Sequence, residues 1–170
     1  MNSNKYLPIL VSGFGAAVLT AVPYVKAFSY FLIIPAASFV ALYLNLRVNN
    51  VLPPISIKSA IVYGFLTGLV LALFSSTFEI LITFIAHSND FVTTLPQTEA
   101  AMRSLNMGSL LDQTMGLLNK MSSEIVTYGF SLLYTIAITF SNVVIDSIFG
   151  IIGGIIGRLI INKKTRQNKI

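Results

Sequence analysis

Long apolar segments constrain this chain more than any other feature of its sequence. Four of them stand between polar stretches, at about residues 7–25, 28–46, 60–85 and 128–161. A helix of roughly 20 residues crosses a hydrocarbon core of about 30 Å, so each segment is long enough for one span. Only 10% of the 170 residues are charged, whereas a soluble domain carries charge at roughly 25% of its positions. The sequence therefore predicts an all-α, integral membrane protein.

The fourth segment is longer than a bilayer requires, because its 34 residues would form a helix of about 51 Å. Two spans with a turn near residues 142–146 would leave only about 15 residues for the last pass. That interpretation also puts the terminal lysines on the wrong side, so we reject it. A single span at about residues 140–161 is expected, with residues 128–141 extending out of the membrane. Residues 1–170 are thus expected to form one membrane domain.

Lysine and arginine are distributed unevenly about these spans, and the positive-inside rule converts that bias into an orientation. With the N-terminus inside, only Lys26, Arg103 and Lys120 of the eleven cations lie outside. The sequence predicts a four-helix bundle with both termini in the cytoplasm, in a bacterial inner membrane. The cytoplasmic cations in this topology are Lys5, Arg47, Lys58, Arg158, Lys163, Lys164, Arg166 and Lys169.

A cleaved signal peptide is the competing interpretation of the first segment. Val25 and Ala27 flank Lys26 in the manner of a small-residue cleavage site. However, the apolar run exceeds the usual length of roughly 7 to 15 residues, and Lys5 is the only cation before it. We therefore expect the segment to be retained as a span.

The outer loop between the third and fourth spans, residues 88–127, is expected to be helical and amphipathic. Pro96 suits the first turn of a short helix over residues 96–106. Ser109 stands three residues before Asp112, a weak capping box for a second helix that continues into the fourth span. The loop is expected either to dock another membrane subunit, a lipid or a peptide, or to cover the bundle as an interfacial element. Helical spacing in the second helix is seen at Leu111, Met115, Leu118, Ser122 and Ile125.

Small residues recur at every fourth position in the third and fourth spans. Positions four apart share one helix face, so each of these helices has a side that admits a neighbouring backbone. Helix packing is the expected role, and homodimerisation through one stripe is the alternative. The stripes consist of Ala60, Gly64, Gly68, Ala72 and Ser76, and of Asn142, Asp146, Gly150, Gly154 and Arg158. The expected pairs are Gly64 with Gly154, Gly68 with Gly150, and Ala72 with Asp146.

Asp146 is the residue that most invites a functional interpretation. It lies 12 residues before Arg158, or about 18 Å along a helix, in the outer half of the hydrocarbon. An ionised carboxylate there is costly, so we expect it to face the bundle interior, to be protonated, or to have a hydrogen-bonding partner. A structural polar clasp and a proton or cation site are both consistent with this pattern. The candidate intramembrane polar site consists of Asp146, Asn142, Ser75 and Ser76.

Motifs of enzymes and metal sites are missing from the sequence. There is no cysteine, and His87 is the only histidine, so a metal would lack a ligand set. Phosphate-binding loops, nucleophile elbows and zinc-protease motifs do not occur either. The cations flank apolar segments and do not form a basic face with interleaved aromatics, which argues against nucleic acid. We therefore expect no enzymatic activity, no cofactor and no metal.

A wider pattern combines a basic exit of the second span at Arg47, a short turn to Ser56, a long outer loop, and a glycine-rich close before Lys163. The small residues Ala60, Gly64 and Gly68 follow the turn. In hydropathy and spacing, the chain resembles a family of small four-helix membrane proteins of Bacteroidota-type bacteria, known as a domain of unknown function. The resemblance covers the whole chain and implies the four-span architecture. It implies no activity and no site residue.

Two classes of function remain open. In the first, the protein is a structural, assembly or interaction subunit that binds a membrane-protein partner or a second copy of itself within the lipid. In the second, it is an oligomeric proton- or cation-coupled transporter or channel that uses Asp146. Oligomerisation is required in the second class, because an isolated four-helix bundle has little room for a pore.

Overall fold

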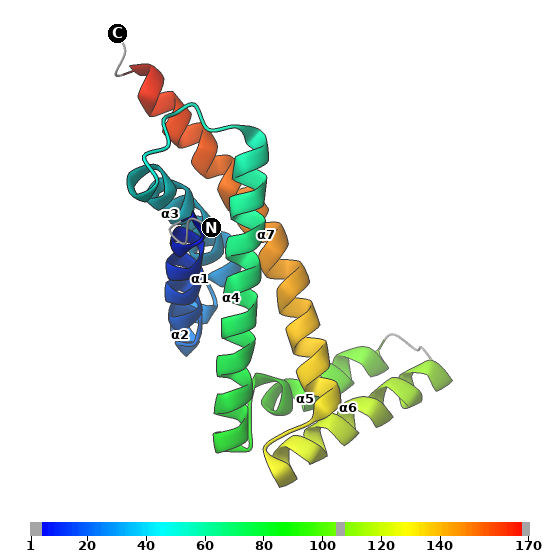
Figure 1. Ribbon diagram of the computed structural model, residues 1–170. Coiled ribbons are helices and arrows are strands. Elements are labelled where there is room, and N and C mark those ends of the chain that lie inside the picture. The colour runs from blue at the N-terminus through cyan, green and yellow to red at the C-terminus, as the bar shows by residue number, and fades with distance from the viewer. Residues whose placement is uncertain (1–4, 105–107, 168–170) are drawn as a thin grey trace. The chain divides into compact units, whose positions relative to one another are not determined.

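The computed structural model describes residues 5–104 and 108–167, and every regular element within them is a helix (Figure 1). The expected all-α class is therefore confirmed. Three helical stretches are long and apolar enough to cross a membrane, namely Ser29–Val48, Ile57–Ala86 and Leu132–Thr165.

The chain forms two compact units, where a single domain over residues 1–170 was expected. Unit 1 comprises Met1–Ser76 and Thr139–Ile170, and unit 2 comprises Thr77–Ile138. The two longest helices, α4 (Ile57–Ala86) and α7 (Leu132–Gln167), each contribute residues to both units.

The first helix, α1 (Leu7–Thr20), is shorter than the span expected over residues 7–25. It ends before Pro23, because a proline ring disfavours helical backbone in the residue that precedes it. Val22 is accordingly extended, with ψ at 121°, and Pro23 begins the separate short helix α2 (Pro23–Lys26). The 14 residues of α1 rise about 21 Å. The expected helix end at residue 25 is therefore wrong.

The segment expected to form the second span begins with a π-helical turn, η2 (Ser29–Ile33), and continues as α3 (Ile34–Val48). These bounds lie within two residues of the expected 28–46. Helix α4 begins at Ile57, three residues before the expected start, and the Ser59 amide donates to Ser56 Oγ at 3.1 Å, which caps its first turn.

Helix directions in unit 1 follow from the places where backbones meet. A Cβ on Gly153 of α7 would overlap the backbone of Pro35, and a Cβ on Gly157 would lie 3.1 Å from the Cα of Phe39. Because the two contacts advance together along both chains, α3 and α7 run in the same direction. Figure 1 shows α1 and α3 side by side, running in opposite directions. Helix α1 also packs on α4, where a Cβ on Gly13 would lie 3.1 Å from the carbonyl oxygen of Thr67.

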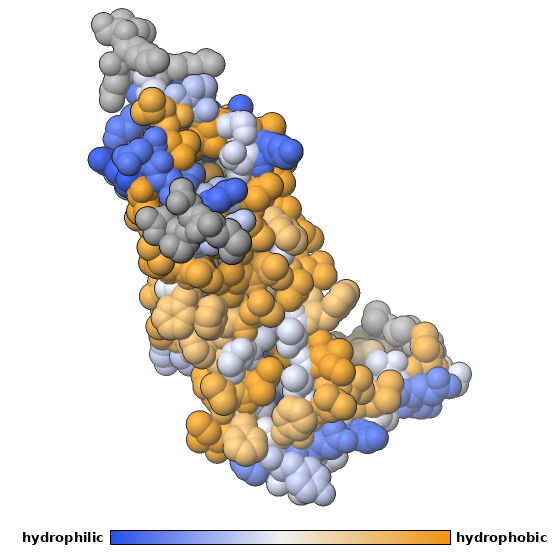
Figure 2. Space-filling view, in the orientation of Figure 1, coloured by the Kyte–Doolittle hydropathy of each residue, from blue (hydrophilic) through white to orange (hydrophobic). Residues whose placement is uncertain are grey.

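Basic residues gather at the end of unit 1 where α1 and α4 begin and where α3 and α7 finish. Hydrogen bonds join these helix ends, because the Tyr63 hydroxyl donates to Asn45 Oδ1 at 2.7 Å and lies 3.2 Å from the Lys5 carbonyl oxygen. In Figure 2, hydrophilic surface marks this end of unit 1, next to an apolar band over its helices. Lys169 and the side chain of Arg166 lie outside the described residues. The described cations at this end are Lys5, Arg47, Lys58, Arg158, Lys163 and Lys164.

Unit 2 contains a helical hairpin, α5 (Asp90–Arg103) and α6 (Ser109–Tyr128), in the part of the chain expected to form the helical loop. Leu111 and Met115 of α6 pack with Leu95 of α5 in a small apolar core. These residues have the spacing that predicted the second loop helix, and that prediction is confirmed.

Helix α5 begins at Asp90, so the expected start at Pro96 is wrong. Asn89 explains the earlier start, because its Oδ1 accepts the Val92 amide at 3.0 Å and caps the first turn. Pro96 consequently lies inside the helix. The expected end at Asn106 lies outside the described residues.

Helix α6 neither starts nor ends as expected. Its preceding residue is Gly108, with φ at 58°, so Ser109 is not its N-cap. At the other end, Gly129 adopts φ of 70° and donates its amide to the Ile125 carbonyl, a left-handed helix stop that favours glycine. Helix α7 then begins afresh at Leu132. The expected continuous helix from the loop into the fourth span is therefore wrong.

Candidate functional site

The small-residue stripes of α4 and α7 lie against each other in unit 1. A Cβ on Gly154 would lie 3.2 Å from the Cα of Gly64, and a Cβ on Gly150 would lie 3.2 Å from the Cα of Gly68. In the opposite direction, a Cβ on Gly64 would overlap the carbonyl oxygen of Gly150. Ala60, at the start of the stripe, is fully buried and presents its carbonyl oxygen to Gly154. The two backbones therefore touch along this seam, because neither side carries a bulky group.

Farther along the same seam, Asn142 and Ser76 form a hydrogen bond between the two helices. Asn142 Nδ2 donates to Ser76 Oγ at 3.0 Å, and Ser76 is buried. Ser75 does not take part, because its hydroxyl donates to the Ala72 carbonyl of its own helix at 3.2 Å. Of the residues proposed for the polar site, the structure thus pairs Asn142 with Ser76.

Asp146 is buried in the seam, with only 3% of its surface exposed. Its backbone carbonyl faces Gly68, where a Cβ would lie 2.8 Å from the carbonyl carbon of Asp146. Within residues 5–104 and 108–167, no side chain or backbone group donates a hydrogen bond to its carboxyl group. The structure therefore encloses Asp146 without joining it to Asn142, Ser75 or Ser76.

Among the residues described in unit 1, four serine hydroxyl groups are also buried without a hydrogen-bond partner. The Oγ atoms of Ser12, Ser29, Ser38 and Ser147 have no hydrogen-bond partner in the described part of the chain. Ser147 follows Asp146 directly, so two adjacent polar side chains of α7 are enclosed without partners. Such groups are costly to bury, which makes them candidates for contacts that a single copy does not supply.

A polar clasp that the sequence did not suggest lies at the basic end of unit 1. Asn162 accepts the Ile55 amide through Oδ1 at 2.8 Å and donates through Nδ2 to the Ile55 carbonyl oxygen at 3.0 Å. Arg158 Nε donates to the same carbonyl oxygen at 3.0 Å. The side chain of Asn162, on α7, therefore provides a hydrogen-bond partner for both backbone groups of Ile55, which lies in the loop before α4.

Asn45 organises a second polar cluster at this end. Its Oδ1 accepts from the Tyr63 hydroxyl at 2.7 Å and from Asn49 Nδ2 at 2.8 Å. Asn45 is 9% exposed and Tyr63 is 7% exposed. An asparagine near a basic helix end is too common a pattern to single out, so the sequence offered no usable signal for either cluster.

Two carboxylates of unit 2, those of Glu79 and Glu124, accept hydrogen bonds from hydroxyl groups. Tyr134 donates to Glu79 Oε1 at 2.8 Å, and Ser131 donates to Glu124 Oε2 at 2.6 Å. Phe91 stacks on the Tyr134 ring with centroids 5.4 Å apart. In the described residues, the histidine and carboxylate side chains form no group of three suited to a metal ion. These contacts resemble structural ties between helices more than a reactive centre.

No protein-family model matches the chain, and comparisons with curated proteins and with solved structures also give no match. The resemblance drawn from hydropathy and spacing therefore stays a prediction. Function has to be argued from the geometry of the two units.

Proposed function

We propose that this protein is a multi-pass membrane protein with four spans and both termini in the cytoplasm, acting as an assembly or interaction subunit. Alternating helix directions in unit 1 support the topology, because α1 and α4 begin at the end where α3 and α7 finish. The described cations at that end fit the cytoplasmic side. The short helix α1 would span with local thinning of the bilayer, as short apolar helices do.

The exposed apolar face of α6 is the observation that carries the proposed function. Leu110, Leu117 and Tyr128 are 57%, 56% and 69% exposed. Steps of 7 and 11 residues bring the three side chains onto one helix face. None of the three belongs to the two described apolar clusters of unit 2, which are built on Leu95, Leu111 and Met115 and on Met121, Ile125 and Tyr134. A face of this kind suits another membrane protein or a second copy.

The closed seam between α4 and α7 supports the assembly role over transport by a single copy. Backbone contact at Gly64 and Gly68 leaves no space for an aqueous path between α4 and α7 at these positions. The transporter or channel alternative would place that path between copies. The partnerless carboxyl group of Asp146 is the observation that favours this alternative.

Leu117→Glu tests the assembly role. Wild-type protein extracted in mild detergent is expected to show a protein mass above the 18.5 kDa of one chain by light scattering on a sizing column. A buried interfacial glutamate is costly, so Leu117→Glu should return most of the protein to the mass of a single chain.

Asn119→Glu is the matched control for this variant, because Asn119 is also exposed on α6 but lies on the opposite side of the helix from Leu117. It should keep the wild-type mass. A wild-type protein that runs as a single chain would contradict the assembly role, as would an unchanged mass for Leu117→Glu. The second result would favour an interfacial element that lies on lipid.

Asp146→Asn separates the assembly role from transport. The substitution keeps the shape of the side chain and removes the titratable group, and no hydrogen bond described in the chain depends on it. We expect an unchanged thermal midpoint and unchanged assembly mass, with no proton or cation flux in liposomes for either protein. Flux in wild type that is lost in Asp146→Asn would establish the alternative and overturn the assembly role.

A further inference from the structure

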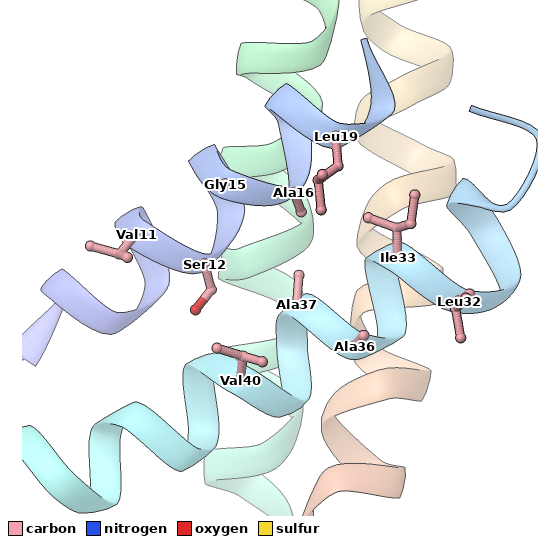
Figure 3. A pocket seen from close by; sticks show the side chains of 10 residues that line it. All are labelled: Val11, Ser12, Gly15, Ala16, Leu19, Leu32, Ile33, Ala36, Ala37 and Val40. Atoms are coloured by element: carbon pink, nitrogen blue, oxygen red, sulfur yellow. The ribbon is translucent and has the colours of Figure 1, made fainter. Parts of the chain in front are cut away.

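An apolar cavity of about 360 Å³ opens between α1 and the η2–α3 segment of unit 1 (Figure 3). Ten residues line it, and Ser12 is the only one with a polar side chain. Small-molecule sites have volumes of about 300–1,000 Å³, so the cavity is large enough for part of an extended apolar ligand.

Small side chains keep this cavity open. Gly15 and Ala16 of α1 and Ala36 and Ala37 of α3 contribute to its lining, between the larger side chains labelled in Figure 3. A Cβ on Gly15 would meet no atom within 4 Å, so the space beside this glycine is empty. In a membrane, an empty apolar cavity loses dispersion contacts that a hydrocarbon chain would restore.

A cationic group lies on the same face of α3 as this cavity. Arg47 follows Val40, which lines the cavity, by seven residues, so the two share a helix face about 10 Å apart along the axis. Helical side chains lean toward the N-terminus of their helix, which directs Arg47 back toward the cavity.

The guanidinium group of Arg47 retains unused donors. Its Nε and Nη2 lie 3.3 and 3.1 Å from the Tyr43 hydroxyl, and its Cζ lies 5.5 Å from the centroid of that ring. Across the described residues, no carboxylate forms an ion pair with Arg47. Arginine binds phosphate through parallel hydrogen bonds, and the Tyr43 hydroxyl holds the guanidinium group of Arg47 in place for such a ligand.

We propose that unit 1 binds an anionic phospholipid, with one acyl chain in the cavity between α1 and α3 and the phosphate on Arg47 and Tyr43. The apolar cavity and the unpaired cation are both required, which selects an anionic lipid over a zwitterionic lipid or free phosphate. The site lies at the basic end of unit 1. This inference rests on the membrane insertion proposed above, and it does not depend on the assembly role.

Binding of defined lipids to the purified full-length protein tests the proposal. In mild detergent, we expect 1-palmitoyl-2-oleoyl phosphatidylglycerol to remain bound in native mass spectrometry and to raise the thermal midpoint. Phosphatidylcholine with identical chains should bind about tenfold more weakly, because it lacks the net charge that Arg47 recognises. Equal retention of the two lipids by wild type would overturn the proposal.

Two variants separate the headgroup contact from the chain contact. Arg47→Gln should lower the affinity for phosphatidylglycerol about tenfold and remove the preference over phosphatidylcholine. Lys58→Gln is the control, because Lys58 is an exposed cation at the same end of unit 1. An equal loss in both variants would mean general electrostatic attraction and would contradict a site at Arg47.

Gly15→Leu should fill the cavity and weaken the binding of both lipids to the same extent. Gly116→Leu is the matched control, because a Cβ on Gly116 also meets no atom within 4 Å and the residue belongs to α6, which does not line the cavity. Unchanged lipid retention in Gly15→Leu would refute the chain contact.

Alkaline extraction of cell membranes distinguishes a failure of the proposed lipid site from a failure of the proposed membrane insertion. A protein that resists alkaline extraction yet shows no lipid preference refutes the lipid site alone. A protein released by alkali would refute membrane insertion and the lipid site together.

Discussion

Gly64→Leu is expected to lower the free energy of unfolding by about 3 kcal/mol or more, because the new side chain has no space between two touching backbones. The first added atom would already overlap the carbonyl oxygen of Gly150 and lie 2.9 Å from the Cα of Ile151. Helices α4 and α7 would have to separate, which would also break the hydrogen bond between Asn142 and Ser76. The thermal midpoint of the purified protein in detergent measures the effect.

Gly116→Leu introduces the same side chain where the neighbourhood is empty. It should leave the midpoint unchanged or raise it slightly, because leucine favours helix more than glycine does. A similar midpoint for Gly64→Leu and Gly116→Leu would show that the two helices do not touch as the structure has them. Gly64→Ala should fall between the two, since its single carbon atom already overlaps the Gly150 carbonyl oxygen.

Asn162→Leu is expected to lower the free energy of unfolding by about 1–3 kcal/mol, because it leaves a buried backbone amide without a partner. Asn162 is the acceptor for the Ile55 amide, and Ile55 is only 6% exposed. The Ile55 carbonyl would keep its hydrogen bond from Arg158. Hydrogen exchange at the Ile55 amide should accelerate together with a fall in the thermal midpoint.

Asn162→Asp keeps the acceptor and removes only the donor. Because the carboxylate can still accept the Ile55 amide, we expect this variant to lose much less stability than Asn162→Leu. Equal losses would mean that the hydrogen bond to the amide contributes nothing, and that packing of the side chain explains the effect.

Several features of the fold were predictable because they depend on local sequence. Apolar segments without interruption predict helices in a membrane, and a spacing of four puts Gly64 and Gly68 on one face. Helix ends were less predictable where two signals compete. Pro96 suggested a helix start, but the cap at Asn89 lies about two turns earlier and dominates. At Gly129, the left-handed stop interrupted a helix that hydropathy alone would have continued.

The polar sites were harder to predict, because hydrogen bonds join groups that are distant in the chain. The candidate polar site included both Ser75 and Ser76, although only Ser76 belongs to the small-residue stripe, and only Ser76 bonds Asn142. The partner of Asn162 is a backbone group 107 residues away. Every residue has such a group, so no side-chain pattern could have pointed to Ile55.

Asp146 shows most clearly which properties of a residue follow from the sequence and which follow from the tertiary structure. The sequence by itself determined its place on an apolar helix and in a stripe that continues to Gly150 and Gly154, since both follow from spacing along the chain. Only the tertiary structure decided that its backbone carbonyl faces Gly68 in the closed seam, and that Asn142 donates its hydrogen bond to Ser76. The physical reason is that contact between two backbones fixes the rotation of each helix, and a side chain's partners follow from that rotation.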